Sequence, residues 1–146
     1  MANELSYLNP AFPMPVAADV VINADAMVGT DGTGHAVAAS DPRCSSIRGR
    51  AEHAVDNAGG VRGALTLLVR GGSYFQDQDG TITRENEGER CYVMGDNTVS
   101  LSDAGGTRPY AGVIIPAQLR LTATSKVIVF FGRWAVSVPT PAKGRS

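Results

Sequence analysis

Residues 91–101 read CYVMGDNTVSL, two short apolar segments on either side of a polar Gly95-Asp96-Asn97 turn. Val, Tyr and Thr favour strands, whereas Asp and Asn tolerate the backbone angles of tight turns and hydrogen-bond to their own main chain. We therefore predict two strands, 91–94 and 98–101, joined by a turn. Cys91 begins the first strand as a small side chain that packs well, and the Cys, Asp and Asn residues are interpreted as structural.

The rest of the chain continues this pattern of short strands and turns. Seventeen glycines and eight prolines leave no window of a dozen residues with uninterrupted helical periodicity. Further strands are predicted at 16–22, 36–39, 46–56, 63–70, 110–115, 126–131 and 133–138, with a tight reversal at 76–81. About eight short strands predict an all-β fold, either a small β-sandwich or a closed β-barrel.

Residues 1–15 form a distinct N-terminal segment. Pro10, Pro13 and Pro15 exclude a regular helix or a central strand there, so we predict an extended Pro-rich arm. The arm is unusually apolar for a free tail and should lie in a groove of its own domain or of a neighbouring molecule. Its apolar residues are Leu5, Tyr7, Leu8, Phe12 and Met14. A single β domain is predicted over 16–139, followed by a flexible tail at 140–146.

Length and charge limit the classes of function. The 146 residues suit one domain, and 13 Lys and Arg against 14 Asp and Glu leave a net charge of −1. No basic stripe is present, so nucleic-acid binding is not expected. No apolar run is long enough for a membrane span, and residues 1–10 lack the pattern of a signal peptide. A charge near zero permits packing against other copies of the chain.

Motifs that suggest chemistry have simpler structural interpretations. The GTDGTG run at 29–34 lacks the Lys and Ser or Thr of a phosphate loop, and the glycine of DQDG at 77–80 comes too early for a calcium loop. His53 is predicted on a strand face with Ala51 and Val55, as a structural histidine. Cys44 and Cys91 are expected to be reduced thiols. No catalytic, cofactor or metal site is predicted, and an enzyme is not expected.

Four segments in order carry a resemblance to a known family. They are Val55-Asp56-Asn57 before a small-residue linker, Val69-Arg70-Gly71 ending a strand, the Cys91 to Val99 hairpin, and Gly106 to Val113. This order is similar to that of bacteriophage capsid decoration proteins, also called cement or head-stabilising proteins. The resemblance covers about 47–115. The proline-rich arm and the long C-terminal KVIVFFGRWAVSV segment depart from the family pattern.

The resemblance implies a structural virion protein that binds the outer surface of a phage capsid lattice and stabilises it. Its partners would be the major capsid protein and neighbouring copies of itself, with a trimer as one arrangement of the copies, and it would be made in the bacterial cytoplasm. The contact residues expected are Leu5, Tyr7, Leu8, Phe12 and Met14 of the arm, with Arg108 offering its guanidinium to a carboxylate or carbonyls.

Two other classes of function are alternatives to the capsid role. A carbohydrate- or host-binding β module would use exposed aromatic residues such as Trp134 and Tyr110 as a platform. A small hydrolase would bring acids or a Cys-His pair together in a pocket. The sequence favours neither over the capsid role.

Overall fold

The computed structural model describes residues 11–115 and 126–131. The predicted strand at 133–138, Trp134, the tail at 140–146 and arm residues Leu5, Tyr7 and Leu8 lie outside these ranges. The described part is all-β, with twelve strands and one 3-10 turn, η1 (Arg84–Asn86). The predicted fold class is confirmed, and its closed-barrel form is present together with additional strands.

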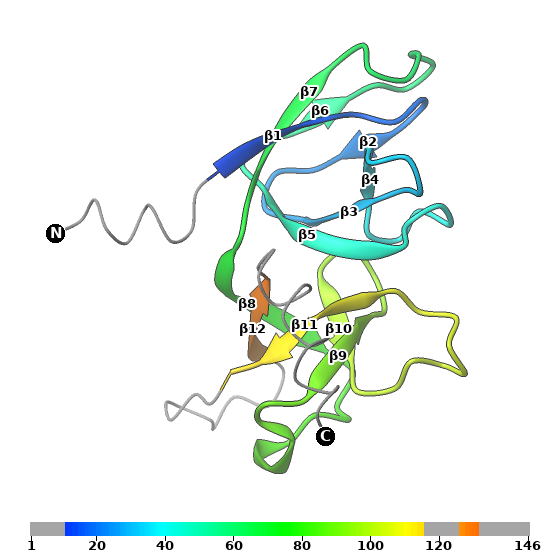
Figure 1. Ribbon diagram of the computed structural model, residues 1–146. Helices are drawn as coiled ribbons and strands as arrows, with labels where there is room; N and C mark the ends of the chain where they lie inside the picture. The colour runs from blue at the N-terminus through cyan, green and yellow to red at the C-terminus, as the bar shows by residue number, and fades with distance from the viewer. Residues whose placement is uncertain (1–10, 116–125, 132–146) are drawn as a thin grey trace, which may run out of the picture.

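The strands divide into an N-terminal half and a C-terminal barrel (Figure 1). The N-terminal half contains β1 (Ala11–Pro15), β2 (Val21–Ile22), β3 (Met27–Thr30), β4 (Ala36–Ala38), β5 (Ser46–Ala51), β6 (Val55–Asp56) and β7 (Thr66–Arg70). The barrel contains β8 (Gly72–Gln78), β9 (Arg90–Val93), β10 (Thr98–Ser100), β11 (Tyr110–Ile114) and β12 (Lys126–Phe131). The buried residues form two hydrophobic clusters, and the cluster of the barrel also includes Met27, Ala39 and Ile47 from the N-terminal half.

The barrel is closed because β11 pairs with β12 along one edge and with β9 along the other. Its strands follow the order β11-β12-β8-β10-β9, and β9 pairs with β11 again. The strands predicted at 91–94 and 98–101 are present as β9 and β10, which pair antiparallel with Val99 opposite Val93. Phe131, Val129 and Cys91 are fully buried inside this barrel.

The N-terminal half curls in the same way. Its strands follow the order β1-β7-β5-β3-β4, and Val16, just after β1, forms a bridge with Ala36 of β4. Leu67 and Val69 of β7 face the core, whereas Leu65, predicted on the same face, lies before the strand and is exposed. β2 and β6 form a separate two-stranded sheet.

The proline-rich residues of β1 form an edge strand. β1 pairs antiparallel with β7, with Pro13 opposite Leu68 and Pro15 opposite Thr66. The Val16 N–H donates to the Leu65 carbonyl at 2.9 Å. Because N–H groups alternate in direction along a strand, the nitrogens of Pro13 and Pro15 face away from β7. The prolines therefore cost no ladder hydrogen bond and remove two donors from the outer edge of β1.

Several strand predictions were wrong in extent: of the strand predicted at 16–22 only Val21–Ile22 is a strand, and the strand predicted at 63–70 begins at Thr66. The predicted strand at 46–56 is broken, because β5 ends at Ala51 and His53 is exposed in the turn before β6. The His53 Nε2 accepts the N–H of Leu68 at 3.3 Å and thereby replaces a strand carbonyl beside β7. The predicted reversal at 76–81 also starts too early, because β8 continues to Gln78 and pairs in parallel with β10.

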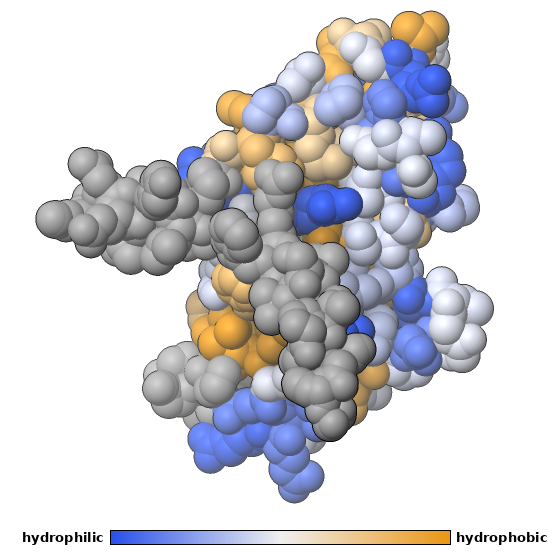
Figure 2. All heavy atoms as spheres, in the orientation of Figure 1, coloured by the Kyte–Doolittle hydropathy of each residue, from blue (hydrophilic) through white to orange (hydrophobic). Residues whose placement is uncertain are grey.

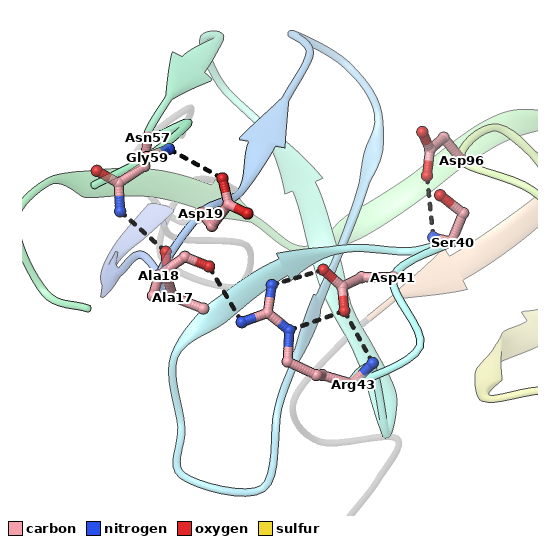
Figure 3. A network of polar contacts seen from close by, with 9 residues as sticks. All are labelled: Ala17, Ala18, Asp19, Ser40, Asp41, Arg43, Asn57, Gly59 and Asp96. Carbon is pink, nitrogen blue, oxygen red and sulfur yellow. Dashed lines mark hydrogen bonds and ion pairs between the residues drawn. The ribbon is translucent and has the colours of Figure 1, made fainter. Parts of the chain in front are cut away.

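The β9–β10 turn joins the two halves of the molecule. The Asp96 carbonyl accepts the N–H of Met27 at 3.0 Å, and its Oδ1 accepts the N–H of Ser40 at 2.9 Å (Figure 3). The Asn97 side chain donates to the Asp25 carbonyl at 3.5 Å. We predicted that these two side chains bond to their own main chain, but both bond to residues of the N-terminal half. Their role is structural, as predicted, and it is a contact between distant segments.

Candidate interaction surface

The described residues of the predicted arm contact their own subunit. Met14 is only 6% exposed and belongs to the N-terminal core, and Phe12 is half-buried against that core. Of the two grooves left open by the sequence, Met14 therefore lies in the one formed by its own domain. Phe12 and Met14 are held there because β1 pairs with β7 along its whole length.

Arg108 makes a local contact. Its Nη1 donates to the Ser102 carbonyl at 3.0 Å, within the loop that joins β10 to β11. The Asp103 carbonyl in the same loop accepts the N–H groups of Gly106, Thr107 and Arg108 at 3.0 to 3.1 Å. The guanidinium thus contacts a carbonyl of its own loop, and its predicted contact with a neighbouring molecule stays a prediction.

Of the two aromatic residues considered for a sugar-binding platform, Tyr110 lies within the described residues. Tyr110 is half-buried, packs edge-on against Tyr92 and lies under the Arg90 guanidinium at 5.2 Å. Its ring face is therefore occupied by its own subunit. Trp134 lies outside the described residues.

An exposed apolar surface on the barrel was not predicted from the sequence. Phe75 on β8 is 59% exposed, and Ile128 lies directly opposite it on β12. Phe130 lies two residues further along β12 and opposite Val113 of β11. Side chains on directly paired residues share one face of a sheet, so these four residues, called the Phe75 stripe below, lie on the outer face of the barrel. Figure 2 shows hydrophobic residues at this surface.

Charged groups border the Phe75 stripe at one end. Lys126 Nζ lies 2.6 Å from Asp77 Oδ1 on the neighbouring strand, and both side chains are about half exposed. An exposed ion pair of this kind contributes little to stability, at most about 1 kcal/mol. An apolar centre with a charged rim is the usual anatomy of a protein–protein contact.

Part of the Phe75 stripe was detectable from sequence. In KVIVFF at 126–131, every second residue belongs to the core, which leaves Ile128 and Phe130 on the opposite face. Phe75 was missed because the Asp-Gly pair after it suggested a reversal, and a strand at 72–78 was not predicted.

One edge of strand β8, next to the Phe75 stripe, is paired with another strand only at its C-terminal end. β8 pairs with β12 from Gly72 to Asp77, but with β10 only at Asp77 and Gln78. The N–H of Asp77 donates to the Asn97 carbonyl on the β10 side, so the main-chain groups of Ser73 and Phe75 face that side too. Among the described residues, no strand pairs with them there.

Polar contacts brace the loops of the N-terminal half (Figure 3). Asn57 is 4% exposed, and its Nδ2 donates to the carbonyls of Ala17 at 2.9 Å and Val61 at 3.1 Å. Asp19 Oδ1 accepts the N–H of Gly59 at 2.9 Å. These bonds fix the loop between β6 and β7 against the segment after β1.

Arg43 and Asp41 form a second brace. The Arg43 Nε and Nη2 donate to the two carboxylate oxygens of Asp41 at 3.0 and 2.8 Å, and Nη1 donates to the Ala18 carbonyl at 3.0 Å. The side-chain hydrogen bonds from Arg43 lower the pKa of Asp41, against the opposing effect of burial.

We predict that Asp41→Asn lowers the free energy of unfolding by about 1 kcal/mol at neutral pH, the upper range for a partly exposed pair. Because the folded-state pKa of Asp41 is depressed, its contribution is present above the unfolded-state value of about 3.9 and disappears as the pH falls through the folded-state value. Urea unfolding of both proteins at neutral pH and at about pH 2 measures this. Glu85→Gln, whose side chain has no bond among the described residues, is the control, and a pH-independent difference for Asp41→Asn would refute the interpretation.

The thiols and imidazoles have structural surroundings. Both cysteines are free, as predicted, and burial raises the pKa of Cys44 to about 11 and that of Cys91 to about 12. These groups are thiols near neutral pH, the opposite of an activated nucleophile. The two ring nitrogens of His53 contact the Leu68 N–H and the Ala54 carbonyl.

Within residues 11–115 and 126–131, no three His, Cys, Asp or Glu side chains gather closely enough to hold a metal ion. No helix among those residues has the length and apolar character to cross a membrane.

Comparison with known proteins adds no relative. No family model matches the chain, and no similar curated protein or solved structure was found.

Proposed function

We propose that this chain is a structural protein of a phage virion, which binds the outer surface of the capsid lattice and stabilises it. One observation carries the proposal: the barrel presents the Phe75 stripe beside an edge of β8 with which no strand of residues 11–115 and 126–131 pairs, on a body whose strands are otherwise held by two cores. Exposed aromatic and aliphatic side chains next to free main-chain groups suit contact with another protein.

The identity of the partner is inferred from the resemblance to bacteriophage capsid decoration proteins. Its segments occupy positions on which the fold depends: Val55 and Cys91 are in the two cores, and Asn57 braces a loop. The proposed partners are the major capsid protein and neighbouring copies of this chain, with a trimer as one arrangement of the copies. Many modest contacts, repeated over a shell, then add up through multivalency, and binding to the assembled lattice stabilises it by mass action.

The proposal is tested by co-sedimentation of the purified chain with empty capsid shells of a phage that encodes it. We expect saturable binding and a higher temperature of shell disruption when the protein is bound. A variant lacking residues 2–9 tests the arm while leaving β1 in place, which a deletion to residue 15 would remove. Its binding should be at least about tenfold weaker, about 1.4 kcal/mol.

Binding that is no stronger than that of an unrelated β protein of equal size would contradict the capsid role. Leu68→Ser, at an exposed residue on β7, is the matched surface control and should bind as the unmodified chain does.

A further inference from the structure

We propose that the barrel binds an acidic segment of its protein partner, whose carboxylates contact Arg48 and Arg90 on opposite sides of β11, beside the Phe75 stripe. This contact rests on the proposed function and adds to it the chemistry by which the barrel recognises the capsid protein. An apolar centre would supply contact area, and the two guanidinium groups would select an acidic surface.

The acidic residues are unevenly distributed along the chain. Residues 104–146 contain six Lys and Arg and no Asp or Glu, whereas residues 1–103 contain all fourteen acidic residues and seven basic ones. Strands β11 and β12 both belong to the basic part, and they supply Val113, Ile128 and Phe130 of the Phe75 stripe. Most of the stripe therefore lies on a part of the chain that has no carboxylates of its own, which favours an acidic partner.

Arg90 presents a guanidinium whose N–H groups are available to a partner. Its Cζ lies over the Tyr110 ring at 5.2 Å, and it forms no ion pair with a carboxylate of residues 11–115 and 126–131. A guanidinium stacked on a ring keeps its donors, which lie in its own plane, for a carboxylate. Arg90 is exposed, and its direct pairing with Val113 places it on the outer face next to the Phe75 stripe.

Arg48 is a second guanidinium without an acceptor. The residue is half-buried, and its Nε is buried with no hydrogen-bond partner in the described part of the chain. Side chains alternate along β5, so Arg48 shares a face with Ser46, which pairs with Tyr110 on the edge of β11 opposite β9. Part of the cost of removing this charge from water is already incurred, so a carboxylate on its terminal nitrogens gains more than at an exposed arginine.

Other arginines already have acceptors within the chain. Arg70 forms an ion pair with Glu52, Arg43 forms one with Asp41, and Arg108 donates to the Ser102 carbonyl. Arg48 and Arg90 have no such acceptor among the described residues, and they lie along the two edges of one strand. Because an apolar stripe lies beside them, the surface suits a protein better than the phosphate backbone of a nucleic acid, which is bound mainly through charge.

The contact is tested by replacing each arginine with glutamine, which removes the charge and keeps a polar side chain. Arg48→Gln and Arg90→Gln should each weaken binding to empty capsid shells by at least about tenfold, measured by co-sedimentation. Arg90→Lys keeps the charge without the planar donor fork and should have an intermediate affinity. Arg62→Gln removes the same charge from an exposed residue between β6 and β7 and should bind as the unmodified chain does.

The salt dependence separates recognition of a charge from a structural role. Raising the ionic strength from about 0.1 M to about 1 M shortens the Debye length from about 10 Å to about 3 Å. The loss of affinity caused by Arg90→Gln should therefore become smaller in high salt. Circular dichroism and urea unfolding confirm the fold of each variant, and the exposed Arg90 keeps the test decisive if the half-buried Arg48 is needed for folding.

The alternatives give different results. No binding of the unmodified chain to the shells would contradict the capsid role and this contact together. Firm binding of the unmodified chain with unchanged affinity of both glutamine variants would contradict the contact alone. A loss that does not change with salt would assign the arginines a structural role and overturn recognition of carboxylates. Equally strong binding to a short DNA duplex, with the same losses in both variants, would overturn the choice of a protein partner.

Discussion

Gly112→Ala is expected to lower the free energy of unfolding by about 3 kcal/mol, at the upper end of the cost of overpacking a core. A Cβ at this position would lie 2.4 Å from the Phe130 carbonyl oxygen and 2.8 Å from a methyl carbon of Val129. Gly112 also faces Cys91 across the β9–β11 pair, so β11 has little space to move toward either neighbour. The added methyl group must separate β11 from β12, one of the five pairings that close the barrel.

Urea unfolding followed by circular dichroism measures the effect, with the slope of the transition as a check that the unfolded state is unchanged. Gly32→Ala is the matched control, because no atom lies within 4 Å of a Cβ placed there. Its stability should change by no more than about 0.5 kcal/mol. Equal midpoints for Gly112→Ala and the unmodified chain would show that the close approach of β11 and β12 is not required.

The elements that sequence predicted well are those with strong local signals. The two strands around the Gly95-Asp96-Asn97 turn follow from β-branched residues on both sides of turn residues, and KVIVFF at 126–131 follows from its apolar character. Short strands inside glycine-rich stretches carried no such signal. β3 occupies four residues that end in the first part of GTDGTG, and its pairing with β4 and β5 decides its conformation.

Long-range pairing explains the rest of the differences. His53 continues the alternation of 46–56, but β5 ends at Ala51, where the chain turns toward β6. Met14 was assigned to an arm because prolines surround it. The sequence does not reveal that β1 pairs with β7 in a register in which Pro13 and Pro15 lose no ladder hydrogen bond. Phe75 became visible as a surface residue only when β8 was found to pair with β12.

Asn57→Asp is expected to cost about 4 kcal/mol at neutral pH, because it replaces a buried amide donor with a carboxylate facing two carbonyls. The Nδ2 of Asn57 donates to Ala17 and to Val61, and both acceptors would be left facing a negative charge. The loop between β6 and β7 and the segment after β1 would then lose the contact that holds them together. Urea unfolding at neutral pH measures this loss.

The pH dependence of that loss identifies its cause. Burial and the two carbonyls favour the protonated form of the introduced carboxyl, so its pKa in the folded state lies above the unfolded value of about 3.9. A raised folded-state pKa means that stability is lost as the pH rises through it, so the deficit should shrink at about pH 4. Asn57→Leu, which cannot ionise, should show a loss that does not change with pH. Equal losses for Asn57→Asp at both pH values would mean that packing around Asn57, and not its two donated hydrogen bonds, holds the loop.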